Sequence, residues 1–232
     1  MNILTSIIRS RKELKLTERE RECVEDGMPW GLTCLGNVAP FPVRLWVAER
    51  QRLLGPSQDL RSDGSNSVVE QIWKALGLKE SIGQSNASTL QGAVLYIGAR
   101  IITLAEQRPP VWWVGTAKAP HMLALLLGLG TAFNTEPTDP LRALGAPQLL
   151  SGPEMGYAMA LIAEYSGTEP KAVLRNTNAE VREGYLGGKA MLNRDIDLRQ
   201  DFQILTSEYD RSEEHTSELQ SPCNLVCRLL LE

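Results

Sequence analysis

Signals that start an α-helix recur along this chain of 232 residues and constrain its fold more than any other feature. In a capping box, a Ser or Thr at the helix N-terminus accepts a hydrogen bond from the backbone N–H three residues later. A Glu or Gln at that later position returns the bond to the backbone of the first residue. Pairs with this spacing predict the starts of several helices: Thr17 with Glu20, Ser67 with Glu70, Ser88 with Gln91, and Ser151 with Glu154.

Apolar residues three and four positions apart follow these signals, as expected for helices that bury one face. Leu90, Val94, Ile97 and Ile101 form one such stripe, which stops before Pro109. Together, the start signals and the stripes predict helices over residues 3–13, 17–25, 42–54, 67–77, 89–107, 120–131, 152–165, 169–175, 178–192 and 195–206.

Strand signals are weak by comparison. Only residues 111–114, Val-Trp-Trp-Val, have local β character, and they fit a buried connector equally well. Helix following helix with short Pro and Gly breaks predicts an all-α, multi-helical globular fold, with two helical subdomains as one arrangement. We expect an N-terminal helical segment over 1–54, a polar linker or loop over 55–66 and a main helical domain over 67–210.

Residues 211–232 resemble the in-frame translation of a common short-read sequencing adapter rather than a natural protein segment. The run Arg-Ser-Glu-Glu-His-Thr-Ser-Glu-Leu-Gln-Ser at 211–221 is similar to one arm of the adapter, and Leu-Val-Cys-Arg-Leu-Leu-Leu at 225–231 is similar to the other. The residues between the arms correspond to the variable index of the adapter. We therefore expect a non-native, adapter-derived tail that does not contribute to the fold, and a natural protein truncated near Asp210.

Without the tail, the chain has a smaller net charge and fewer residues that could bind a metal. The net charge falls from −4 to about −2, because the tail holds two basic and four acidic residues. Near-neutral charge argues against a generally basic nucleic-acid-binding protein, although a local basic patch is compatible with it. Cys23, Cys34 and His121 remain, without the spacing of a zinc site. We predict no metal and no cofactor.

The sequence is typical of an intracellular, cytoplasmic protein that does not contact membranes. Two cysteines outside the tail are too few for a disulfide framework, which favours a reducing compartment. The N-terminal apolar stretch is too short for a secretory signal. The longest apolar run, residues 122–133, is far shorter than the roughly 20 residues that span a bilayer.

Residues 16–22, Leu-Thr-Glu-Arg-Glu-Arg-Glu, resemble the opening of a LuxR-type helix-turn-helix domain. That resemblance implies a second helix and a recognition helix. We expect residues 27–30, Gly-Met-Pro-Trp, to break the chain after the first helix instead, because proline is unfavourable inside a helix. A charged, solvated helix is the favoured interpretation.

Candidate catalytic residues are few. His121 lies in the first turn of a predicted helix, and a structural role is favoured over that of a general base, because the sequence shows no nucleophile or orienting carboxylate for it. Gly128 and Gly130 lack the rest of a dinucleotide fingerprint and are expected to end a helix. The sequence leaves the question of catalysis open and favours a protein that is not an enzyme. The alternative is a helical intracellular enzyme or regulator whose catalytic residues are lost by truncation.

Two groups of residues are candidates for binding. Trp112 and Trp113 could present aromatic surface to a partner or stack on bases, although burial in the core is the favoured interpretation. Arg175, Arg182 and Lys189 recur every seven residues, so one side of a helical segment could carry a basic stripe that neutralises nucleic-acid phosphates. A solvated face balanced by neighbouring carboxylates is the favoured interpretation of these three residues.

Residues 156–170, Gly-Tyr-Ala-Met-Ala-Leu-Ile-Ala-Glu-Tyr-Ser-Gly-Thr-Glu-Pro, resemble a small-residue helix and the following turn in nucleoproteins of nonsegmented negative-strand RNA viruses. That resemblance implies a multi-helical protein that binds RNA through a basic cleft and polymerises along it. We therefore predict a non-catalytic helical binding and assembly protein, with a nucleic-acid-coating, nucleoprotein-like subunit as its specific version. Its expected partners are copies of itself and RNA.

Overall fold

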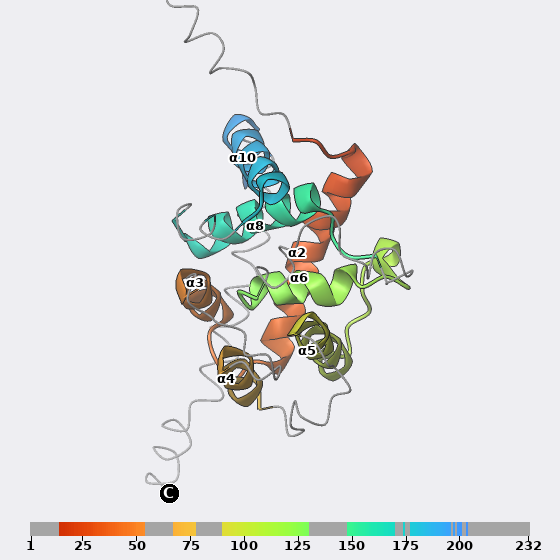
Figure 1. The fold of residues 1–232 in the computed structure, drawn as a ribbon, viewed down its shortest axis with the longest axis vertical. Helices are drawn as coiled ribbons and strands as arrows, with labels where there is room; N and C mark the ends of the chain where they lie inside the picture. The colour runs from red at the N-terminus through yellow and green to blue at the C-terminus, as the bar shows by residue number, and fades with distance from the viewer. Residues whose placement is uncertain are drawn as a thin grey trace, which may run out of the picture.

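The computed structural model describes residues 14–53, 67–77, 90–129, 148–169, 174, 177–195, 197, 199–200 and 203. These residues form seven α-helices and a 3₁₀ turn and contain no strand, which confirms the predicted all-α fold (Figure 1). The elements are α2 (Glu18–Val38), α3 (Val43–Leu53), α4 (Ser67–Ala75), α5 (Leu90–Ala105), η2 (Val111–Trp113), α6 (Lys118–Leu126), α8 (Gly152–Ser166) and α10 (Ala179–Arg194).

Capping boxes begin α2 and α8, as the sequence predicts. At α2, the backbone N–H of Glu20 donates to Thr17 Oγ1 at 3.3 Å, and the backbone N–H of Thr17 donates to Glu20 Oε2 at 2.8 Å. At α8, the backbone N–H of Glu154 donates to Ser151 Oγ at 3.4 Å, and that of Ser151 donates to Glu154 Oε2 at 2.8 Å. Each box satisfies N–H groups that a helix leaves without a partner at its start.

Helix α2 continues through Pro29, where the sequence predicts a break. The prediction of a break was wrong, since the helix runs for 21 residues. An internal proline costs about 3 kcal/mol, and packing along the helix offsets that cost. A Cβ on Gly27 would lie 1.9 Å from the Trp113 ring, and one on Gly31 would lie 2.7 Å from the Leu126 side chain. The two glycines therefore let side chains from other elements contact the α2 backbone directly.

Helix α6 lies at the centre of the fold and packs against α2, α5 and α8 (Figure 1). Every residue from His121 to Leu129 is buried. Gly128 adopts a left-handed conformation, with φ of +74°, and its backbone N–H donates to Leu125 O at 3.0 Å. Gly128 therefore ends the helical segment, as predicted, because glycine takes positive φ without a steric penalty.

Helices α8 and α10 form the most extensive helix pair among the described elements. Their backbones approach each other where glycine removes the side chain. A Cβ on Gly156 would stand 2.1 Å from Val181 O and 2.6 Å from Tyr185 N, and one on Gly184 would stand 2.5 Å from Pro153 O. Close backbone approach of this kind requires glycine on both helices.

The buried residues of α2 and α3 belong to the same hydrophobic cluster as those of α5, α6, α8 and α10. The described parts of the predicted segments 1–54 and 67–210 therefore share one core. Several expectations lie outside the described residues: the helix over 3–13, the linker 55–66, the tail 211–232, and most of the helices over 169–175 and 195–206.

Candidate interaction surface

The two adjacent tryptophans of η2 lie in different environments, one in the core and the other at the surface. Trp113 is 1% exposed, whereas Trp112 is 53% exposed. Trp113 therefore does not present aromatic surface to a partner, which agrees with the favoured core interpretation and corrects its inclusion among the candidates for partner binding. The reason is that a single 3₁₀ turn directs neighbouring side chains to different sides. Trp112 remains a candidate for binding.

Trp113 anchors the turn in the core. Its ring meets Trp30 edge to face, with centroids 6.0 Å apart and an angle of 87° between the ring planes. The Trp113 carbonyl accepts hydrogen bonds from Thr116 Oγ1 at 2.9 Å and from the Thr116 backbone N–H at 3.1 Å. Pro109 and Pro110 restrict the backbone on the other side of the turn. The backbone of η2 is thus held from both directions.

Three apolar side chains project from this anchored backbone, and we call them the apolar turn. Val111 is 77% exposed, Trp112 is 53% exposed and Val114 is 67% exposed. The guanidinium carbon of Arg19, from the first turn of α2, lies 4.5 Å from the centroid of the Trp112 ring. This distance is within the range of about 6 Å for a cation–π interaction. Clustered exposed apolar residues, unlike scattered ones, mark interaction sites.

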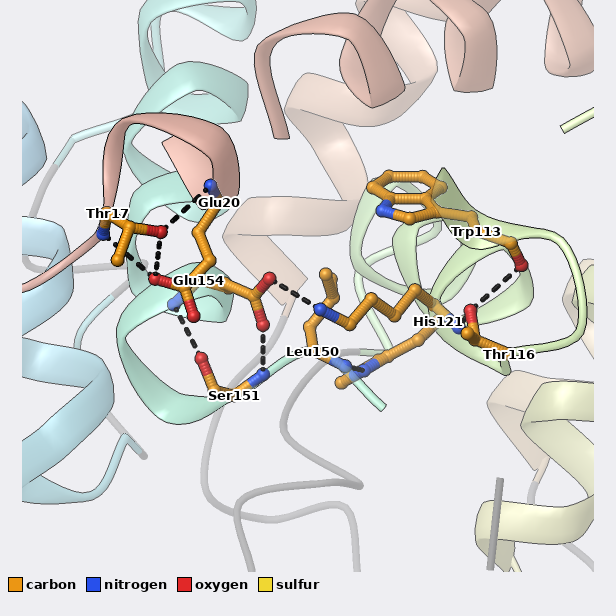
Figure 2. A network of polar contacts seen from close by, with 9 residues as sticks. Thr17, Glu20, Trp113, Thr116, His121, Leu150, Ser151 and Glu154 are labelled. Carbon is orange, nitrogen blue, oxygen red and sulfur yellow. Dashed lines mark hydrogen bonds and ion pairs between the residues drawn. The ribbon is translucent and has the colours of Figure 1, made fainter. Parts of the chain in front are cut away.

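A buried polar network lies beside the turn and joins α6 to α8 (Figure 2). Lys118 Nζ donates to Glu154 Oε1 at 2.7 Å, and the two side chains are 13% and 2% exposed. The other carboxylate oxygen of Glu154 accepts the capping bond from Ser151. His121 Nδ1 accepts a hydrogen bond from the Leu150 backbone N–H at 3.2 Å. The network therefore holds the chain that enters α8 against the start of α6.

Burial keeps His121, Cys23 and Cys34 in unreactive forms. It lowers the pKa of His121 to about 3, so the ring is neutral and serves as an acceptor. Burial also raises the pKa of the Cys34 thiol to about 12 and raises the pKa of Cys23. A thiol is a poor nucleophile compared with a thiolate. These environments agree with the structural role that the sequence favours for His121.

Two of the three residues in the predicted basic stripe lie within the described part of the chain, and Arg175 lies outside it. Arg182 is exposed on α10. Lys189 Nζ donates to Glu164 Oε2 at 2.7 Å, and Arg199 Nη2 lies 2.7 Å from Glu164 Oε1. The charge of Lys189 is thus balanced inside the protein, which leaves Arg182 as the more accessible cation.

The residues that resemble nucleoproteins have packing and capping roles in this fold. Gly156 permits the close approach of α10, and Tyr165 is 3% exposed. Gly167 has φ of +67° and ends α8 in the left-handed conformation. The hydroxyls of Ser166 and Thr168 are hydrogen-bonded at 2.7 Å just beyond the helix. Local geometry therefore accounts for the small residues and for the turn.

An open groove of about 930 Å³ lies between residues 14–21 and α10. Leu14, Leu16 and Met191 supply its apolar lining, and charged residues surround them. The sequence does not predict this groove, because its two walls are separated by more than 150 residues along the chain and no local pattern connects them. The one residue in the sequence that could have indicated the groove is Gly187, because a glycine there lets α10 approach Leu14 closely.

The described ranges also lack two features that would indicate a site of another kind. None of the helices there is long and apolar enough to cross a membrane. In the same ranges, no His, Cys, Asp and Glu side chains gather to form a metal site. Comparisons of the chain with protein-family models, with curated proteins and with solved structures find no match.

Proposed function

We propose that this protein is a non-catalytic helical subunit that assembles with copies of itself through the apolar turn. The observation that carries the proposal is the joint exposure of Val111, Trp112 and Val114 on one anchored segment. Burial of apolar surface contributes about 25 cal/mol per Å², and a tryptophan side chain buries up to roughly 250 Å². Tryptophan is also enriched among the residues that dominate binding energy at interfaces.

The turn is rigidly held, which favours binding further. Trp113 is packed against Trp30 and Gly27, and Thr116 is hydrogen-bonded to the Trp113 carbonyl. A surface that already has its bound conformation loses little conformational entropy when a partner binds. The apolar side chains of the turn therefore retain most of the free energy of their burial.

The polar side chains near the turn support assembly over catalysis. Glu154 is engaged by Lys118 on one oxygen and by the Ser151 N–H on the other. His121 is buried and uses Nδ1 to accept from Leu150. A general base must reach a substrate proton directly or through one water, and groups committed to the fold do not meet that requirement.

A nucleic-acid-coating, nucleoprotein-like subunit is the specific version of this proposal. Arg19 places a cation over the Trp112 ring, and Arg182 adds an exposed cation on α10. Proteins that bind single-stranded nucleic acid use basic side chains that follow its backbone. In this version, copies that associate through the turn bind the same RNA strand.

Sedimentation analysis over a range of protein concentrations tests the proposed assembly. We expect the wild-type chain to self-associate, and Trp112→Ser to raise the dissociation constant at least tenfold. Leu45→Ser is the matched control, because Leu45 is 71% exposed on α3, on the other side of the molecule from the turn (Figure 1). Equal dissociation constants for the wild type and Trp112→Ser would contradict the proposal, with circular dichroism confirming that both variants are folded.

A further inference from the structure

We infer that the apolar turn of one copy binds in the groove between residues 14–21 and α10 of a second copy. This inference rests on the proposed function and adds the surface that receives the turn. The two surfaces match in size, in apolar character and in charge. They also lie on neighbouring parts of the molecule, on two sides of the first turn of α2.

The groove has the size and the lining that an inserted aromatic side chain requires. Its volume of about 930 Å³ lies within the range of about 300–1,000 Å³ that is usual for binding pockets. Leu14, Leu16 and Met191 line it and are each only half-buried. Insertion of Trp112 would therefore remove apolar surface from water on both partners.

The charges of the two surfaces are complementary. Three carboxylates and two guanidiniums surround the groove, which gives its lining a formal charge of −1. The rim is therefore acidic on balance, whereas Trp112 carries Arg19 on its ring. Complementary charges steer association and fix the orientation of the partners. The carboxylates belong to Glu18, Asp195 and Asp197, and the guanidiniums belong to Arg21 and Arg194.

The first turn of α2 stands between the turn and the groove of the same chain. Glu18 and Arg21 line the groove, whereas Arg19 lies over Trp112. A helix with its side chains is about 10–12 Å across, so the two surfaces are close neighbours, yet the helix separates them within one copy. Within one copy the turn therefore does not enter the groove, and we assign the groove to the turn of another copy. Two copies can exchange both contacts about a twofold axis and form a closed dimer.

Complementing variants test this arrangement in the full chain by sedimentation analysis. Trp112→Ser removes the inserted side chain, and Ala190→Arg fills the groove from the α10 side. Asp197→Arg is a second groove variant at an exposed position, which reverses a charge on the rim without altering the core. We expect each variant alone to raise the dissociation constant of the dimer at least tenfold, and Leu45→Ser to leave it unchanged.

The decisive measurement is an equimolar mixture of Trp112→Ser and Ala190→Arg. This mixture retains one intact contact between a wild-type turn and a wild-type groove, so we expect heterodimers that are tighter than either homodimer. A mixture that stays monomeric would overturn the pairing of turn and groove. If only Trp112→Ser weakens association, the inference fails and the proposed function stands. If no variant, including Trp112→Ser, weakens association, both fail.

Discussion

Lys118 Nζ lies 2.7 Å from Glu154 Oε1, where the two side chains are 13% and 2% exposed, and this ion pair joins the start of α6 to the start of α8 (Figure 2). Glu154 also closes the capping box with Ser151. The apolar turn ends at Val114, only a few residues before Lys118, where α6 begins. The network that holds two helices together therefore also positions the candidate interaction surface.

Removal of one partner of this ion pair should be strongly destabilising. Lys118→Met leaves the Glu154 carboxylate buried without its cation, and an uncompensated buried charge costs about 3–5 kcal/mol. The double variant Lys118→Met with Glu154→Met should recover part of that loss, because neither charge is then buried alone. Chemical denaturation measures both free energies of unfolding. A double variant less stable than Lys118→Met would contradict this account.

The close approach of α8 and α10 makes Gly156 sensitive to a single added methyl group. Its Cβ would lie 2.1 Å from Val181 O, which is backbone and does not move independently, so Gly156→Ala should cost about 1–3 kcal/mol or more. Gly31→Ala is the comparison, because there the nearest atom is the flexible end of the Leu126 side chain at 2.7 Å. Thermal denaturation of both variants checks the order. A loss at position 31 as large as that at 156 would contradict it.

His121 should make the protein less stable as the pH falls below about 6.5. Burial lowers its pKa from 6.5 to about 3 in the folded state. Between these values the unfolded chain binds the proton and the folded chain does not, so stability increases with pH in this window and is lost as pH falls. The slope approaches about 1.4 kcal/mol per pH unit.

His121→Asn isolates that contribution, because an amide oxygen can accept from the Leu150 N–H without titrating. The pH dependence of the free energy of unfolding between pH 4 and 6, measured by urea denaturation, should be shallower in this variant than in the wild type. Identical slopes would show that His121 does not titrate between the folded and unfolded states as described.

Arg182 should contribute to RNA binding if the protein coats nucleic acid. Arg182→Glu should weaken binding to a single-stranded RNA oligonucleotide and reduce the slope of log K against log salt by about 0.7 for each phosphate that the variant no longer neutralises. Fluorescence anisotropy at several salt concentrations measures both quantities. Lys74→Glu is the control, since Lys74 is exposed on α4. Arg175→Glu extends the test to the residue outside the described ranges, whereas reversal of Lys189 would also break its ion pair with Glu164.

Deletion of residues 211–232 should leave thermal stability unchanged or raise it, because their sequence resembles translated adapter DNA and not a natural segment. The melting temperatures of the full chain and the shortened chain provide the test. A decrease of more than about 4 °C on deletion, equivalent to roughly 1 kcal/mol or more, would mean that the tail is integrated in the fold.

The all-α fold and most helix starts could be predicted because their signals are local. The bonds between Thr17 and Glu20, and between Ser151 and Glu154, span three residues and form wherever the helix does. Gly128 likewise ends its helical segment through its own backbone conformation. The spacing of residues is therefore enough to predict the order of the helices, although the observed ends differ from the predicted ones by a few residues.

Interactions between distant parts of the chain decided the rest. Helix α2 passes through Pro29 and contacts the ring of Trp113 at Gly27, although Trp113 lies 86 positions later and no local pattern contains that contact. The same packing buries Trp113 and leaves Trp112 exposed. A capping bond needs only its own turn of helix, whereas burial, the pairing of Lys189 with Glu164 and the groove beside α10 depend on surfaces that meet only when the chain has folded.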